Sequence, residues 1–344
     1  MRLPLVLATL LVLAATPALA ETPVPPPVAT VLDGRLPIGN ALLPLFLSQD
    51  WAQPLPQIHR AVIIVHGYQR NAADYAHDVM NFVPPADTLV VAPQFLAVED
   101  IAPHQLPNTM LRWDREAWSD GEPAEGPSPT SAFDVLDAIL GKLNDPAILP
   151  NLTQIVVAGF SAGGQLVQRY AIVGKGELGL RERNIRVRYV VGSPSSFAYF
   201  TDERPRPDGT VARFSDTAAC PGFNRWKYGF AGGLPPYVAA VAALGTPGLE
   251  QRYLARDVFY LVGADDTNPQ HRFLDKSCAG EAQGPTRLAR MQFFIAEMKL
   301  RGGAAFKQPM HIAAGAAHNA AKVLGSPCGR AALFGDGSCP EDKP

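Results

Sequence analysis

The stretch QIVVAGFSAGG, residues 154–164, decides the fold of this chain. Its first residues are apolar and mostly β-branched, which favours a buried strand, and the residues after Ser161 continue as a helix to Ile172. The junction, residues 159–163, has the form Gly-X-Ser-X-Gly. In such a junction a sharp, strained turn exposes the serine hydroxyl, and the two glycines make room for it. The pattern predicts that Ser161 is a nucleophile; a plain strand-to-helix turn is the alternative.

Outward from this turn, short apolar runs alternate with amphipathic helical stretches. We expect strands at 61–65, 88–92, 154–158, 187–191, 258–262 and 309–313, and helices at 72–82, 131–143, 162–172 and 285–300. Strands separated by helices pair in parallel and are covered on both faces. The sequence therefore predicts an α/β fold with a doubly wound, mainly parallel sheet, whose functional loops lie at the carboxyl ends of the strands.

The chain is expected to have three parts. Residues 1–20 combine a basic start, an apolar stretch and a small-residue site ending at Ala20, which is typical of a cleaved signal peptide. Residues 21–37 are proline-rich and are expected to form an extended leader, and residues 38–344 a single catalytic domain. Segments at about 99–129 and 193–255 interrupt the alternation, and we expect them to form lid-like insertions that shape a substrate cleft.

The composition argues against several classes of protein and partner. Hydrophobic residues make up 47% of the chain and charged residues 18%, a balance that supports a large core and argues against global disorder. The formal net charge is only -2, which is too small to attract nucleic acid or an anionic membrane. The N-terminal apolar stretch is short for a spanning helix. We therefore expect a secreted or periplasmic protein without a membrane anchor.

The cysteine count indicates disulfides. Cys220, Cys278, Cys328 and Cys339 form an even set, which fits an oxidising compartment. Three pairings are open, and we favour Cys220 with Cys278 and Cys328 with Cys339, because the second pair would close a Gly- and Pro-rich tail. The sequence has no Cys-X-X-Cys spacing and no helical His-X-X-X-His spacing. No metal site is predicted, and we expect no cofactor.

Two further residues complete a predicted catalytic triad. A serine hydroxyl needs an imidazole to accept its proton and a carboxylate to orient that imidazole. When a nucleophile turn is followed in order by an acid and a histidine, the acid follows a late strand and the histidine the last one. Asp265 and Asp266 follow the strand at 258–262, and His318 follows the strand at 309–313. We favour Asp266, the third residue after the glycine, over Asp265, and His318 over the other histidines.

Backbone amides are expected to bind the oxyanion of a tetrahedral intermediate. One amide is that of Ala162, the residue after the nucleophile, and the other is that of Tyr68, in the loop after the strand at 61–65. We interpret His66, in the same loop, as a structural residue. Aromatic residues gather in the two interrupting segments, and we expect core packing for them rather than a cleft wall. They are Trp113, Trp118, Phe197, Tyr199, Phe200, Trp226 and Tyr228.

The loop at His66-Gly67, the turn at Ser161, the turn at Asp266 and His318 together resemble the α/β-hydrolase superfamily. The resemblance covers residues 61–319. It implies the α/β-hydrolase fold and the triad roles given above, but it names no substrate.

A narrower resemblance concerns the stretches 65–71, 167–170 and 226–229, which are similar to a group of exported hydrolases of fungi and bacteria. The turn at Ser161 resembles, less closely, exported polyhydroxybutyrate depolymerases and feruloyl esterases. Asn319 departs from the acidic or apolar residue that many members of the superfamily have after the histidine. We expect an exported serine hydrolase that cleaves a small or polymeric carboxylic ester through an acyl-enzyme. A peptidase or acyltransferase on the same fold and a non-catalytic binding protein are the alternatives.

Overall fold

The computed structural model describes residues 26–206, 208–335 and 339. The predicted signal peptide, residues 1–20, and the first residues of the predicted leader lie outside these ranges. Within them no helix is long and apolar enough to cross a membrane.

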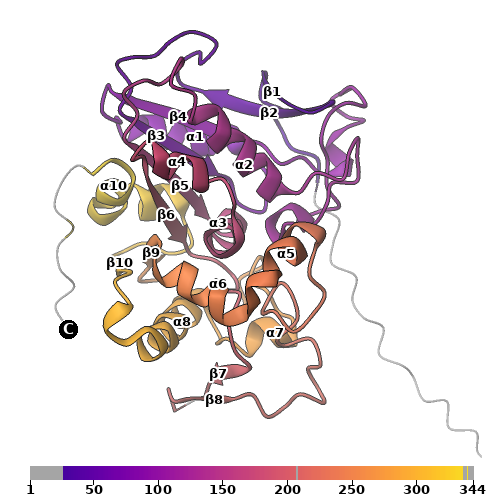
Figure 1. The fold of residues 1–344 in the computed structure, drawn as a ribbon. Helices are drawn as coiled ribbons and strands as arrows, with labels where there is room; N and C mark the ends of the chain where they lie inside the picture. Colours follow the sequence, from indigo (N-terminus) through magenta and orange to yellow (C-terminus); the bar gives the residue numbers. More distant parts are fainter. Residues whose placement is uncertain (1–25, 207, 336–338, 340–344) are drawn as a thin grey trace, which may run out of the picture.

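An eight-stranded sheet forms the centre of the molecule (Figure 1). In spatial order its strands are β1 (Gly34–Ile38), β2 (Ala41–Leu47), β4 (Thr88–Pro93), β3 (Arg60–Val65), β5 (Gln154–Phe160), β6 (Arg186–Gly192), β9 (Asp257–Gly263) and β10 (Met310–Ala313). β2 is antiparallel to both of its neighbours, and the strands from β4 to β10 pair in parallel. The predicted doubly wound, mainly parallel sheet is confirmed, and its six parallel strands are those expected from the sequence.

Helices cover both faces of this sheet (Figure 1). Successive side chains of a strand point to opposite faces, so that in β3 Ile63 and Val65 join one core cluster and Val62 and Ile64 the other. The first cluster is covered by α2 (Ala132–Leu143), α3 (Ala162–Val173), α5 (Pro236–Val241), α6 (Gly245–Leu254) and α8 (Arg287–Gly302), and the second by α1 (Ala72–Asn81), α9 (Ala320–Leu324) and α10 (Pro327–Phe334). Short helices α4 (Leu178–Glu182) and α7 (Cys278–Glu281) lie in connections.

The predicted leader was wrong at its end, because residues 34–37 belong to strand β1. They pair with β2, which itself pairs with β4, so the sheet extends two strands further than expected. The residues before β1 are also held in place. Val28 donates its amide to Asp100 Oδ1 at 2.8 Å, and Leu32 donates its amide to Gln94 Oε1 at 2.9 Å. Asp100 in turn forms a buried ion pair, at 2.8 Å, with Arg70, which lies in the loop after β3.

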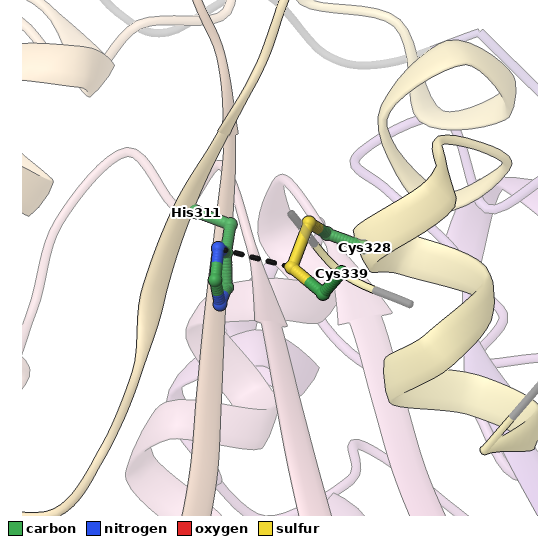
Figure 2. Close-up of side chains that lie close together, drawn as sticks. All are labelled: His311, Cys328 and Cys339. Atoms are coloured by element: carbon green, nitrogen blue, oxygen red, sulfur yellow. Dashed lines mark hydrogen bonds between the residues drawn. A yellow bond between two sulfur atoms is a disulfide. The ribbon is translucent and has the colours of Figure 1, made fainter. Parts of the chain in front are cut away.

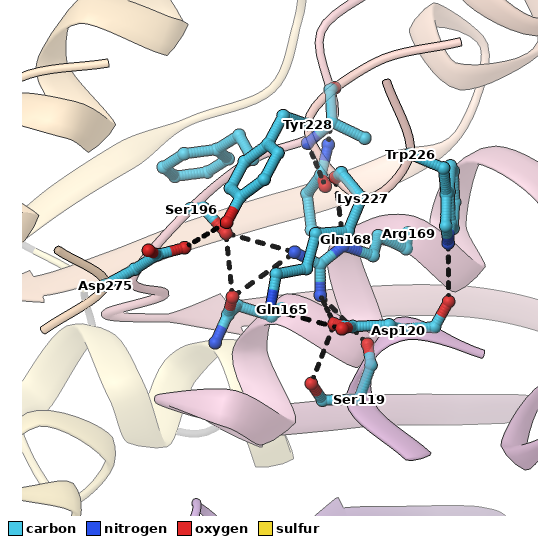
Figure 3. A network of polar contacts seen from close by, with 12 residues as sticks. Ser119, Asp120, Gln165, Gln168, Arg169, Ser196, Trp226, Lys227, Tyr228 and Asp275 are labelled. Atoms are coloured by element: carbon cyan, nitrogen blue, oxygen red, sulfur yellow. Dashed lines mark hydrogen bonds and ion pairs between the residues drawn. The ribbon is translucent and has the colours of Figure 1, made fainter. Parts of the chain in front are cut away.

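A polar network connects the two interrupting segments, at about 99–129 and 193–255, to α3 (Figure 3). Arg169 of α3 is buried and donates to Asp120 of the first segment at 3.1 Å and to Ser196 of the second at 3.1 Å. Lys227 of the second segment also pairs with Asp120, at 3.1 Å, and the Trp226 indole donates to the Asp120 carbonyl. The second segment additionally contains a two-stranded sheet, β7 (Glu203–Pro205) and β8 (Val211–Arg213).

Both favoured disulfide pairings are confirmed. Cys220 is bonded to Cys278, and Cys328 of α10 to Cys339. Figure 2 shows His311 of β10 beside the second bond, with its Nδ1 3.1 Å from Cys339 Sγ. Although these three side chains lie as close together as metal ligands do, both sulfurs are consumed in the S–S bond and offer no thiolate to a metal ion.

Candidate active site

Ser161 lies in the sharp turn between β5 and α3 that its sequence predicts. Its backbone has φ 60° and ψ -119°, a strained conformation for a residue other than glycine. The turn is close to its neighbours, because a Cβ atom on Gly159 would lie 2.3 Å from the Gly163 carbonyl oxygen. A Cβ atom on Gly163 would lie 2.4 Å from the carbonyl oxygen of Val65 in β3. Glycine is therefore required at both positions, and the turn places Ser161 at the carboxyl edge of the sheet.

The structure brings Ser161, Asp266 and His318 together. His318 Nε2 lies 3.0 Å from Ser161 Oγ, and His318 Nδ1 lies 2.8 Å from Asp266 Oδ2. Asp266 is 4% exposed, whereas Asp265 is exposed, and its amide donates to the Ala316 carbonyl. Of the two aspartates considered from the sequence, Asp266 is the one that contacts His318.

Burial and charge set the protonation of this group. Burial lowers the pKa of His318, the hydrogen bond to Asp266 opposes this, and the charge of Arg287 lowers the pKa further. Burial alone would raise the pKa of Asp266, but the hydrogen bond from His318 and the charge of Arg287 hold it below its ordinary value. At neutral pH Asp266 is therefore ionised and His318 neutral. The Nδ1–H then donates to Asp266, which leaves the Nε2 lone pair to accept the Ser161 hydroxyl.

The loop after β3 lies directly against the turn at Ser161. A Cβ atom on Gly67 would lie 3.5 Å from Ser161 Cβ. Tyr68 follows in this loop, and Ala162 is the first residue of α3. In the part of the chain that the structure describes, neither of these two amides donates a hydrogen bond. That these two amides bind an oxyanion stays a prediction.

His66 holds this loop in shape. Its Nδ1 donates to the Gly67 carbonyl at 2.8 Å, and its Nε2 accepts the Phe95 amide at 2.9 Å. Complete burial lowers its pKa to about 4, so the ring is neutral at physiological pH. The ring also packs edge-on against Trp118, with centroids 4.7 Å apart. These contacts agree with our interpretation of His66 as a structural residue.

Ser161 and His318 line an open cleft of about 390 Å³. One wall consists of the loop after β3 and α1, and it carries Asn71, Asp74 and Asp78. Residues 271–273 and the start of α9 also line it.

Our expectation that the two interrupting segments shape the cleft is wrong for the residues described here, since none of its lining residues comes from 99–129 or 193–255. Most of their aromatic residues are used in the hydrophobic core instead: Trp113, Trp118, Phe197, Tyr199 and Phe200 are buried. The preference for core packing over a cleft wall matches this. The polar network through Arg169 is a second reason why the two segments do not line the cleft, because it holds both of them against α3.

Two residues that sequence reasoning did not assign to the site lie against the group of Ser161, His318 and Asp266. The Arg287 guanidinium is buried with Nη1 3.6 Å from Asp266 Oδ1. The His271 ring lies in the cleft wall, edge-on to His318 with centroids 5.0 Å apart. The sequence position of Arg287 could have indicated a nearby anion, because a cation in the first turn of a helix opposes the helix dipole and needs a compensating negative charge. The sequence around His271 gives no such indication, since its loop has no periodic pattern.

Comparison with known proteins gives a likeness in structure alone. No protein-family model matches the chain, and no curated protein is similar to it in sequence. A poly(3-hydroxybutyrate) depolymerase from Bordetella parapertussis superposes with a TM-score of 0.58 at 18% identity, covering 89% of this chain and 92% of that one. Poly(aspartic acid) hydrolase-1 from Sphingomonas sp. KT-1 superposes with a TM-score of 0.56 at 18% identity, covering 87% and 96%. With the strand order and the turn at Ser161, this likeness establishes that the chain has the α/β-hydrolase fold.

Proposed function

We propose that this chain is an exported serine hydrolase that cleaves a carboxylic ester through an acyl-enzyme, with Ser161 as nucleophile, His318 as general base and Asp266 as the residue that orients His318. The observation that carries the proposal is the continuous contact from Ser161 Oγ through His318 to Asp266, at 3.0 and 2.8 Å, on the wall of an open cleft. The two structural neighbours are themselves named as a hydrolase and a depolymerase of polymers, which agrees with hydrolytic chemistry on this scaffold.

Acylation begins when Ser161 Oγ attacks the ester carbonyl carbon while His318 Nε2 takes the hydroxyl proton. The carbonyl electrons move onto oxygen, and the amides of Tyr68 and Ala162 donate to the resulting oxyanion. The Asp266 carboxylate stabilises the imidazolium that has formed. When the C–O bond to the alcohol breaks, His318 returns the proton to the leaving oxygen.

Deacylation repeats these steps with water. Neutral His318 takes a proton from a water molecule, which attacks the acyl carbon, and the tetrahedral intermediate again uses the two amides. Collapse releases the carboxylic acid, and the proton on His318 restores the Ser161 hydroxyl. No charge on the chain has changed at the end of the cycle.

The cleft favours short or polar esters over long fatty acyl esters. Asn71, Asp74 and Asp78 give one wall a polar surface, which offers little apolar area to bury an extended hydrocarbon chain. The open cleft can also admit the end of a polymer chain. We therefore propose a small or polymeric ester with polar substituents.

A fluorophosphonate probe tests the proposal. The purified protein should gain one covalent adduct by intact mass, and the Ser161→Ala variant should gain none while keeping the same circular dichroism. Matched p-nitrophenyl esters and p-nitroanilides of the same acyl groups separate an esterase from a peptidase. A wild-type protein that takes up no probe would be a binding protein, and the proposal would be abandoned.

Export is the remaining part of the proposal. The two disulfides support it, because such bonds persist in oxidising compartments. N-terminal sequencing of the protein recovered outside the cytoplasm should begin at Glu21, after cleavage behind Ala20. Recovery of the reduced, uncleaved chain from the cytoplasm alone would contradict export.

A further inference from the structure

A buried arginine lies behind the acid of the proposed triad. Arg287 is 1% exposed and is the first residue of α8. Its Nη1 lies 3.6 Å from Asp266 Oδ1, the carboxylate oxygen that does not face His318. Its other two nitrogens donate to Ser195 Oγ at 3.1 Å and to the Phe273 carbonyl at 2.6 Å. One guanidinium therefore contacts the triad acid, the segment after β6 and the cleft wall.

This position is unfavourable for a cation. Burial removes water from the charge, and the amino end of α8 carries a partial positive charge of its own. Burial lowers the pKa of Arg287 to about 10, with the nearby Asp266 opposing that shift, so the group is still charged at neutral pH. Asp266 supplies the compensating negative charge. The α8 backbone adds a further contact, because the Leu288 amide donates to the Asp266 carbonyl at 3.3 Å.

We infer that Arg287 is a positioning residue of this site: its charge attracts the outer oxygen of Asp266 in an ion pair at 3.6 Å, so that the inner oxygen faces His318, and its hydrogen bond to the Phe273 carbonyl connects the cleft wall to the same group. The inference rests on the proposed function. The charge of Arg287 adds an electrostatic effect, since it keeps Asp266 ionised and disfavours a second positive charge on His318. Arg287 thereby links the geometry of the triad to the pH at which His318 can act as a base.

Arg290 provides a matched control on the same helix. It is fully buried, and it donates to the carbonyl oxygens of Gly284, Ser195 and Asp275. Within the described ranges it forms no ion pair with Asp266. Loss of either arginine leaves buried carbonyl groups unpaired, but only loss of Arg287 removes the positive charge that pairs with Asp266. A purely structural arginine and a positioning arginine can therefore be told apart.

The experiment compares Arg287→Met, Arg287→Lys and Arg290→Met by the pH dependence of kcat/KM on a p-nitrophenyl ester. For Arg287→Met we expect kcat/KM to fall about 100-fold, because a small misplacement of a catalytic group has an effect of about that size. The acidic limb should move to a pH about one unit higher, since His318 is no longer repelled by a neighbouring cation. Arg290→Met should leave the acidic limb in place.

Arg287→Lys keeps the charge but not the planar fork that reaches three partners. We expect its acidic limb to match that of the wild type and its kcat to fall at least tenfold. A fully active lysine variant would overturn the positioning role. This outcome decides the inference even if the methionine variant does not fold.

A second readout needs no turnover. Imidazole resonances of protein labelled with ¹⁵N-histidine report the titration of His318, which is assigned by its loss in His318→Gln. The midpoint should rise in Arg287→Met and stay unchanged in Arg290→Met. An unchanged midpoint in a folded Arg287→Met protein would overturn the inference. If the midpoint rises but neither esters nor amides are hydrolysed, the proposed function fails while the contact between Arg287 and the triad acid stands.

Discussion

His66 and His318 lie in two loops at the same edge of the sheet, and both imidazoles have a lowered pKa because they are buried. Their partners differ. Both ring nitrogens of His66 are bonded to backbone groups, the Gly67 carbonyl and the Phe95 amide. The nitrogens of His318 are bonded to two side chains, those of Asp266 and Ser161, and the ring lines the cleft. A perturbed pKa therefore does not by itself identify a catalytic histidine; its partners and its access to a ligand do.

Replacing His318 should have the largest effect on activity. In His318→Gln the side chain can no longer accept the Ser161 proton, and we expect kcat/KM to fall by about 10⁴-fold or more. The melting temperature should change little, because the loop is partly exposed. Ester hydrolysis and thermal unfolding measured on one preparation check this. If His318→Gln lost as much stability as His66→Phe, His318 would be a structural residue like His66.

Replacing His66 should mainly reduce stability. In His66→Phe the Gly67 carbonyl and the Phe95 amide lose their buried partner, and we expect the free energy of unfolding to fall by about 2 to 4 kcal/mol. Urea denaturation measures that change. The folded fraction should keep far more activity than His318→Gln does. If the two variants were equally inactive, a direct role of His66 in the chemistry would have to be considered.

The pH dependence should separate the same two residues. In the proposed mechanism neutral His318 is the active form, and its pKa lies below 6.5, so kcat/KM should fall about tenfold per pH unit only below that pKa. His66 has a folded-state pKa of about 4 against 6.5 unfolded, so the stability it contributes is present above 6.5 and is lost as the pH falls toward 4. Activity and unfolding are measured over the same pH series: His66→Phe should remove part of the acid destabilisation and leave the acidic limb of kcat/KM in place.

The smallest effect is expected at Asp265. It is exposed and lies next to Asp266 in sequence, and its amide donates to the Ala316 carbonyl in the loop that carries His318. Asp265→Asn should change kcat/KM less than twofold, whereas Asp266→Asn should lower it by several orders of magnitude, because the His318 tautomer is no longer fixed. Steady-state kinetics of the two variants decide between the neighbours. A large loss in Asp265→Asn would reverse the assignment.

The parallel strands, β3, β4, β5, β6, β9 and β10, could be predicted because each is a short apolar run between turn residues. β1 and β2 were missed. β1 alternates apolar and polar residues only briefly and follows a proline-rich stretch, so nothing local separates it from a leader. Its strand character comes from pairing with β2, and that of β2 from pairing with β4, which are contacts between segments.

The sequence by itself determined the turn at Ser161 and the chain order serine, acid, histidine, because these depend on residues that are neighbours or that follow particular strands. Only the tertiary structure decided that Asp266 rather than Asp265 contacts His318, that Arg287 lies behind it and that residues 271–273 form a cleft wall. Asp266 and His318 are 52 positions apart, and Ser161 and His318 are 157 apart. The spacing after Gly263 favours Asp266 over Asp265, but it does not show that this carboxylate is buried against a distant imidazole, since burial and charge pairing exist only after the segments have packed together.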